Sequence, residues 1–183
     1  MKTEHLKLLP HDPADLLALL KNADEYAKSA GMRVAPGVRE YLLAASPDFI
    51  AQLRADTAPD PWKLGFAIVQ CLDNLVIGLC GFTGLPDADG IAEIAYCIAP
   101  GYQGKGYATE AVQALVDYAV ASKRVFVVRA HTLAETNAST RVLEKCGFTK
   151  TATIADPENN VVWRWELALA PHSQKVAKQP VQV

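Results

Sequence analysis

The clearest pattern in the chain is a helical one between residues 108 and 122. Apolar residues recur there at the i, i+3, i+4, i+7 spacing that places them on one face of a helix, at positions 108, 111, 112, 115, 116 and 119. The pattern predicts an amphipathic helix that packs one face against the rest of the protein.

Before this helix the pattern is typical of strands. Two apolar and β-branched runs, over residues 63–72 and 75–83, are separated by Asp73 and Asn74, which suit a hairpin turn. A third run, over residues 91–99, follows a loop rich in Gly, Asp and Pro. We expect these three runs to form antiparallel strands.

After the helix, strands and one further helix alternate. The continuous apolar run over residues 125–130 predicts a strand that is covered on both faces. A helix is then expected to begin near Asn137 or Ser139 and to end at Gly147. Residues 148–155 and 161–168 predict two closing strands joined by a turn.

The first 60 residues are the least regular, with a short strand over residues 5–9 and helical segments interrupted at Gly31, Pro36, Pro47 and Pro59. The whole order indicates an α/β (α+β) domain whose mixed, mostly antiparallel central sheet has about seven strands flanked by about four helices. We assign this single domain to residues 1–170, and we expect residues 171–183 to form a flexible polar tail.

Composition narrows the possible partners. The 183 residues carry 18 Lys and Arg against 20 Asp and Glu, and a net charge of −2 offers no positive field for a nucleic acid. The longest stretch without a charged side chain, residues 74–86, is shorter than a membrane-spanning helix. Because the N-terminal sequence also lacks the apolar core of a secretory signal, we expect a cytoplasmic protein with no nucleic-acid or membrane partner.

The four cysteines and four histidines are scattered along the chain without the spacing of metal ligands. Free cysteines of this kind are mostly buried, reduced thiols. We therefore predict no metal site.

The segment richest in chemistry is residues 98–110, IAPGYQGKGYATE, where a strand leads through a glycine loop into the amphipathic helix. The first N–H groups of a helix lack internal acceptors and lie at the positive end of its dipole, so they bind anions such as pyrophosphate. Gly104 and Gly106 permit the torsions and close backbone approach that such binding needs. The alternative is that these glycines only cap the helix.

Two common phosphate-binding loops do not fit this segment. Gly101 and Gly106 have the spacing of the first two glycines of a P-loop, but Tyr107 stands where the lysine is required. A dinucleotide fingerprint that begins at Gly104 would need a third glycine where Thr109 stands.

The run Gln103-x-x-Gly106-x-Ala108 resembles the acyl-CoA signature of the GNAT superfamily of N-acetyltransferases. The longer run PGYQGKGYATEAV resembles the branch that contains the ribosomal-protein N-terminal (RimJ/RimL-like) acetyltransferases. Residues 137–148, NASTRVLEKCGF, resemble a later helix of that branch, which ends in Gly-Phe. The resemblance covers about residues 62–165 and implies a GNAT-like domain.

The resemblance also implies which residues bind acetyl-CoA. The backbone of residues 103–108 is expected to hold the pyrophosphate, the end of the preceding strand the pantetheine, and the later helix the thioester end. The implied cofactor-binding residues are Ile98, Ala99, Gln103, Gly104, Lys105, Gly106, Tyr107, Ala108, Asn137 and Arg141. In one departure from the family pattern, the usual Asn position holds Thr136, and Asn137 follows one step later.

Acetyl transfer to an amine also needs proton transfer, since a free amine of this kind has a pKa of about 10.4. Glu93 interrupts an apolar strand and is our candidate base, against the alternative of a solvent-exposed carboxylate. By the same resemblance, Leu143 occupies the position at which many GNAT enzymes have a Tyr that protonates the leaving thiolate. Ser139 is our candidate proton donor, with a plain helix N-cap as the alternative, and Tyr96 is a further candidate below it.

The predicted function is an acetyl-CoA-dependent N-acetyltransferase that acts by direct attack of a primary amine on the thioester. The acceptor, a protein N-terminus or a small-molecule amine, stays open, as does the choice between monomer and homodimer. The alternative is a catalytically inactive acyl-CoA-binding sensor or scaffold.

Overall fold

The structure is a computed structural model that describes residues 1–157 and 160–169, so the predicted tail lies outside the described residues. The N-terminal elements are β1 (Leu6–Pro10), α1 (Pro13–Lys21), α2 (Ala23–Ala30), β2 (Arg33–Val34), α3 (Val38–Leu43) and α4 (Pro47–Ala55). The remaining elements are β3 (Phe66–Gln70), β4 (Leu75–Phe82), β5 (Ile91–Ile98), α5 (Tyr107–Ser122), β6 (Val127–Leu133), α6 (Ala138–Lys145), β7 (Thr149–Asp156) and β8 (Asn160–Ala168).

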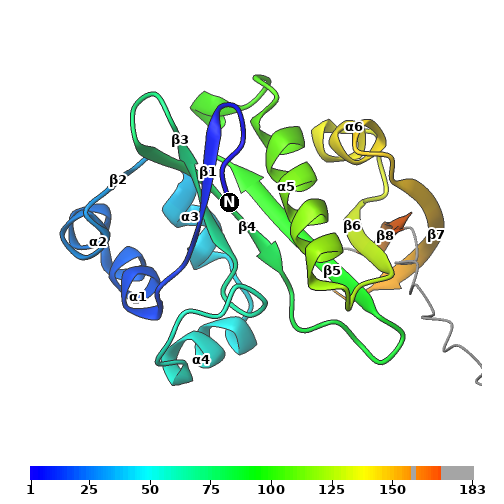
Figure 1. The fold of residues 1–183 in the computed structure, drawn as a ribbon, viewed down its shortest axis with the longest axis horizontal. Coiled ribbons are helices and arrows are strands. Elements are labelled where there is room, and N and C mark those ends of the chain that lie inside the picture. The colour runs from blue at the N-terminus through cyan, green and yellow to red at the C-terminus, as the bar shows by residue number, and fades with distance from the viewer. Residues whose placement is uncertain (158–159, 170–183) are drawn as a thin grey trace, which may run out of the picture.

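All strands belong to one sheet with the order β1-β3-β4-β5-β6-β8-β7, and the short β2 pairs with β4. The pairings β5 with β6 and β2 with β4 are parallel, and the others are antiparallel. In Figure 1, α1 and α2 lie at one end of the sheet, α6 lies near the other, and α5 crosses between them. The predicted mixed, mostly antiparallel sheet is thereby confirmed.

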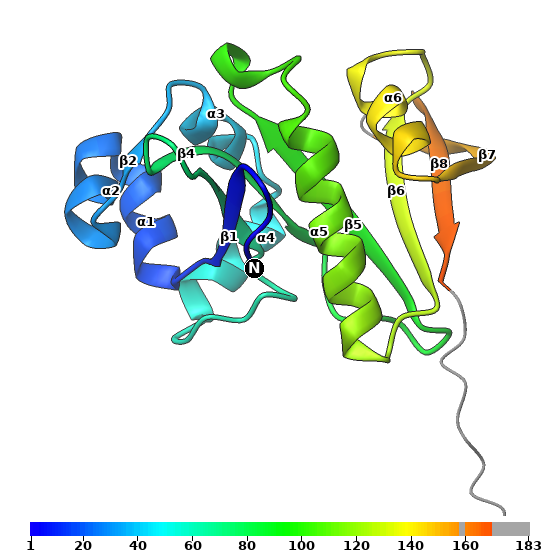
Figure 2. The same cartoon turned by 45° about the horizontal axis from the view of Figure 1, so that its top comes forward.

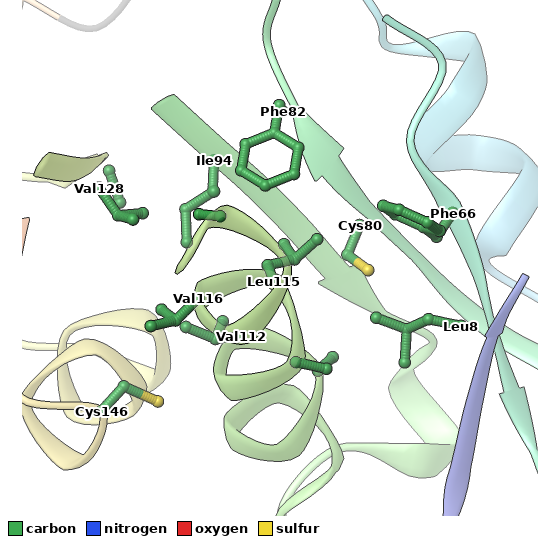
Figure 3. Packing of buried hydrophobic residues seen from close by; sticks show 14 of the residues in the cluster. Leu8, Phe66, Cys80, Phe82, Ile94, Val112, Leu115, Val116, Val128 and Cys146 are labelled. Carbon is green, nitrogen blue, oxygen red and sulfur yellow. The ribbon is translucent and has the colours of Figure 1, made fainter. Parts of the chain in front are cut away.

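Two hydrophobic clusters lie on opposite faces of the sheet. On one face, the apolar positions of α5 pack against strand residues such as Phe66, Cys80 and Ile94, as Figure 3 shows. On the other face, α1 to α4 enclose a second cluster that includes Leu16, Leu53 and strand residues of β3 and β4. The sheet is therefore covered on both faces in its N-terminal half.

Local signals explain the N-terminal helices. Asp12 caps α1 by accepting a hydrogen bond from the Ala14 N–H, and Ser46 caps α4 in the same manner. A proline follows each cap at the first helical position, where its missing N–H costs nothing. Pro47 therefore begins a helix and does not interrupt one, contrary to the expectation from the sequence. The described part of the chain contains six α-helices rather than about four.

One further expectation is wrong. Residues 125–130 were expected to form a strand covered on both faces, but burial alternates along β6. Val128 and Ala130 are buried, whereas Arg129 and His131 are only half-buried because they point to the face opposite α5. This alternation places the polar side chains of Arg129 and His131 next to β5.

No helix among the described residues is long and apolar enough to cross a membrane. The same residues contain no group of three or more His, Cys, Asp or Glu side chains that could hold a metal ion. All four cysteines are free, and Cys80 and Cys146 are buried.

Candidate functional site

A wedge-shaped gap opens in the sheet between β5 and β6. The two strands pair only where residues 91–93 meet residues 127–129. Beyond Glu93 they separate toward the end of the sheet that carries the glycine loop and α6 (Figure 2). Hydrogen bonding to a neighbouring strand alternates along β5, and the Ala99 N–H donates to Ile77 on β4. The backbone groups of Tyr96 and Ile98 therefore face the gap.

The glycine loop brings the start of α5 to the mouth of this gap. Gly104 and Gly106 have positive φ angles of 75° and 87°, which residues with a Cβ adopt at a cost. The first intrahelical hydrogen bond runs from the Glu110 N–H to the Gly106 carbonyl. The N–H groups of the preceding helical residues have no intrahelical acceptor, so the helix presents unpaired donors at its positive end.

A cavity of about 330 Å³ fills this region, and we call it the strand-gap cavity. Eight of the predicted site residues line it, namely Ile98, Gln103, Gly104, Gly106, Tyr107, Ala108, Ser139 and Arg141. Lys145, which was not among the predicted site residues, also lines it. The structure thus brings together loop, strand and helix residues that lie far apart in the sequence.

Four predicted site residues do not line the strand-gap cavity. Ala99 is buried, and its N–H and carbonyl are already bonded to Ile77 and Tyr102. The Lys105 ammonium donates to the Gly101 carbonyl at 3.2 Å, outside the cavity. Of the remaining two, Asn137 caps α6 and Glu93 contacts His131.

The start of α6 is fixed by Asn137, which is its N-cap. The Asn137 side-chain oxygen accepts from the N–H groups of Ser139 and Thr140, and the Thr140 hydroxyl accepts from the Asn137 N–H. The N-cap alternative for Ser139 is therefore wrong. The Ser139 carbonyl accepts a hydrogen bond from the Tyr96 hydroxyl at 3.2 Å, which ties α6 to β5 across the gap.

Glu93 lies where β5 and β6 begin to separate. Its carboxylate contacts the Nδ1 atom of His131, on β6, at 2.9 Å. The Nε2 atom of His131 is buried without a hydrogen-bond partner among the described residues. The Glu93 carboxylate is therefore paired with a histidine, while its side chain is still 35% exposed.

A second cavity of about 440 Å³ lies on the face of the sheet that α1 to α4 cover, and we call it the helix-side cavity. Its lining includes Phe49, Phe82 and other apolar residues of β4, α3 and α4. Both cavities are lined by Tyr41, Tyr96 and Cys97, so they meet at β5. Burial raises the pKa of the Cys97 thiol to about 11, which keeps it protonated and unreactive at neutral pH.

His11 lies at the far end of the helix-side cavity and is only 4% exposed. Its Nε2 atom is buried without a partner among the described residues. Burial lowers the pKa of the His11 imidazole from its usual 6.5 to about 4, although a hydrogen bond with the Phe66 backbone partly opposes this effect. The ring is therefore neutral at physiological pH.

Sequence reasoning missed His11, His131 and Lys145. Lys145 follows Arg141 by one helical turn, so the helical spacing could have indicated it. The two histidines carry no comparable signal, because their importance depends on strand register and burial.

The pKa of His11 predicts how stability depends on pH. Between pH 6.5 and about 4 the unfolded chain protonates His11 while the folded protein does not, so the unfolded state binds more protons and stability falls as the pH falls. The pKa difference corresponds to about 3 kcal/mol. Urea denaturation from pH 7 to pH 4 should show the wild type losing up to about this much more unfolding free energy than His11→Gln. Parallel losses in both proteins would contradict the assignment.

Residues 5–149 match the family model described as an acetyltransferase (GNAT) domain. An uncharacterized N-acetyltransferase p20 of Bacillus licheniformis is 36% identical over 93 residues, which cover 51% of this chain and 52% of that protein. The chain thus aligns with about half the length of the curated relatives it matches.

Solved structures share the fold. RimL, a ribosomal L7/L12 alpha-N-protein acetyltransferase in complex with coenzyme A, has a TM-score of 0.63 at 16% identity over 91% of this chain and 96% of that one. A ribosomal-protein-S5-alanine acetyltransferase from Vibrio fischeri has a TM-score of 0.61 at 15% identity, covering 92% of this chain and 95% of that one. With the family match over most of its length, the chain belongs to the GNAT acetyltransferase family.

Proposed function

We propose that the protein is an acetyl-CoA-dependent N-acetyltransferase in which a primary amine attacks the thioester directly. The observation that carries this proposal is the gap between β5 and β6, with the unpaired N–H groups of α5 at its mouth. A strand edge with free backbone groups suits the amide-rich pantetheine arm, and a helix N-terminus suits pyrophosphate. Family membership and the resemblance to a coenzyme A complex support this assignment.

The strand-gap cavity is the proposed acetyl-CoA site. The backbone N–H groups of the glycine loop and of the first turn of α5 bind the pyrophosphate. The side chains of Arg141 and Lys145, which line the cavity from α6, supply positive charge. The backbone groups of Tyr96 and the Ile98 N–H bind the pantetheine along β5, whereas the Ile98 carbonyl already accepts a hydrogen bond from the Gln103 side-chain amide at 2.9 Å. Lys105, turned toward Gly101, has a smaller part than the sequence predicted.

The helix-side cavity is the proposed acceptor site. The two cavities meet at Tyr96 and Cys97, so a thioester that reaches this point from one side is open to an amine from the other. Binding both reactants at this junction replaces a bimolecular encounter with an oriented attack. The protonated Cys97 thiol takes no covalent part, and acetyl passes from sulfur to nitrogen in one transfer.

Proton transfer is assigned to Glu93, and stabilisation of the leaving thiolate to Tyr96. Glu93 projects from the same face of β5 as Ala95, which lines the acceptor cavity, and through water it takes the proton that the amine must lose. His131 positions this carboxylate. Burial raises the pKa of Tyr96 well above its usual range, so the phenol stays protonated and can donate a hydrogen bond to the leaving thiolate. The proton that neutralises the thiolate is the one that Glu93 took from the amine, returned through water. Tyr96 is better placed than Ser139, because it lines both cavities.

The branch of the family, the location in the cell and the oligomeric state are assigned from the sequence alone. The resemblance to the ribosomal-protein N-terminal acetyltransferases suggests kinship with that branch, but it does not identify the acceptor. The cytoplasmic location and the monomeric or homodimeric state stay predictions.

Acetyl-CoA binding tests the proposal, with two glycines of the same loop as a matched pair. We expect acetyl-CoA at 100 times its Kd to stabilise the protein by about 2.7 kcal/mol in thermal denaturation, and NADH to have no effect. Gly106→Ala should weaken acetyl-CoA binding about five- to thirtyfold, because φ of 87° costs a residue with a Cβ about 1–2 kcal/mol, and the loop avoids this cost by leaving the conformation that binds the pyrophosphate. Gly101→Ala should not, because its φ is not positive and a Cβ there meets nothing within 4 Å. Equal stabilisation by NADH, or equal effects of the two variants, would contradict the site.

The role of Glu93 predicts a specific change in the pH profile. Glu93→Gln should lower kcat/KM about 100-fold at pH 7, and the deficit should shrink as the pH approaches the pKa of the amine, where the base is no longer needed. Steady-state kinetics from pH 6.5 to pH 10 would measure this. An unchanged rate and profile would remove the assignment of Glu93. Binding of acetyl-CoA without transfer to any amine would instead favour the alternative of an inactive sensor.

A further inference from the structure

Four residues in a row, His11, Gly65, Gly81 and Ala95, form the floor of the helix-side cavity. The two in the middle are glycines and have no side chain. The His11 N–H donates to the Gly65 carbonyl at 3.1 Å, and Gly81 pairs with Ala95. Gly65 and Gly81 approach so closely that a Cβ on Gly81 would lie 2.5 Å from the Gly65 Cα. The floor therefore runs across three strand spacings, about 14 Å, from His11 on one side to β5 on the other.

The walls of this slot are largely apolar and aromatic. Tyr41 and Phe49 line it together with aliphatic residues of α1, α3 and β4. Among the described residues of its lining there is no Asp or Glu, and the one charged side chain is Lys63, which pairs with Asp56 at 3.6 Å. Such a slot suits one flat apolar group and disfavours a polycation.

His11 supplies a polar end to the slot. The hydrogen bond between its ring and the Phe66 backbone favours protonation, as expected where a ring N–H donates to a carbonyl. Nε2, the nitrogen without a partner, then carries a lone pair in the neutral ring. A buried acceptor without a partner is costly, and a ligand that brings a donor removes this cost.

We propose that the acceptor is a primary amine on a flat, apolar body whose far end carries a hydrogen-bond donor, such as a hydroxyaryl group, that binds His11 Nε2. This inference rests on the proposed function and specifies its substrate class. The amine lies at the Tyr96 end of the slot, where the cavities meet, and the donor lies at the His11 end. His11 is thus a specificity-determining residue. The same chemistry is offered by a free hydroxyarylalkylamine and by a peptide with an N-terminal Tyr.

The test uses acceptors that differ by one hydroxyl group. We would measure kcat/KM of the full chain for tyramine against phenethylamine and for Tyr-Gly-Gly against Phe-Gly-Gly, with spermidine as the polycation. The wild type should prefer the hydroxylated member at least about tenfold, since a site built to bind a donor rejects the analogue that lacks it. The pair with the higher kcat/KM identifies the source as free amine or peptide.

Variants then assign the preference to His11. His11→Leu removes the acceptor and should bring the ratio to about one, whereas His11→Gln places an amide oxygen near the Nε2 position and should retain much of it. His5→Leu, which changes a histidine outside the cavity, should leave the ratio unchanged. The stabilisation of each variant by acetyl-CoA verifies that it is folded.

The outcomes separate this inference from the proposed function. A wild-type ratio near one in both pairs, a preference for spermidine, or a ratio that persists in His11→Leu would overturn the acceptor class while leaving N-acetyltransfer intact. If acetyl-CoA binds but none of these amines is acetylated, the acceptor class is overturned, and transfer to any amine in a broad panel then decides the proposed function separately. Because the wild-type ratio needs no variant, the test holds even if His11→Leu does not fold.

Discussion

The site depends on one interruption of hydrogen bonding, the separation of β5 from β6 after three residue pairs. A buried strand edge without a partner is costly unless something else occupies it. Here the separation exposes the edge of β5 beside the unpaired N–H groups of α5. The Tyr96 hydroxyl spans the gap to the Ser139 carbonyl, so α6 closes its third side. The separated strands, the start of α5 and α6 together form the site that we propose for acetyl-CoA, a long ligand rich in amide and phosphate groups.

In the proposed function the same strand contacts both substrates, because it has an edge and a face. The edge of β5 borders the strand-gap cavity, and its Ala95 and Cys97 side chains border the helix-side cavity. The helices α1 to α4 cover that face and leave a slot over Gly65 and Gly81, where no side chain fills the space. Coenzyme binding and acceptor selection are thus assigned to different parts of the chain. The acceptor side depends on the N-terminal third, where the sequence pattern was least informative.

The elements with strong periodicity could be predicted from the sequence. The spacing of apolar residues predicted α5, and the turn at Asp73 and Asn74 predicted the β3–β4 hairpin. Pro47 was misinterpreted because a proline that interrupts a helix and one that begins a helix look alike until the cap, here Ser46, is recognised. The apolar residues 125–128 concealed the alternation of burial along β6, because Val127 and Val128 are both apolar although only Val128 is buried.

The site was predictable where it depends on local backbone geometry and not where it depends on register. The glycine loop could be recognised from its residue types and their spacing. His11 and Gly65 become neighbours of the site only through the order β1-β3-β4-β5, which no local pattern indicates. Asn137 was expected beside the thioester, but its side chain is occupied by the two N–H groups that it caps.

The most direct test of the central claim is a titration of the ¹⁵N-labelled protein with acetyl-CoA, followed by the backbone amide resonances. If the helix N-terminus and the open edge of β5 bind the coenzyme, the largest shifts should occur at residues 104–108 and at Tyr96 and Ile98, with little change along β7. Shifts confined to other regions, or no shift at millimolar acetyl-CoA, would contradict the claim that this gap in the sheet is the acetyl-CoA site.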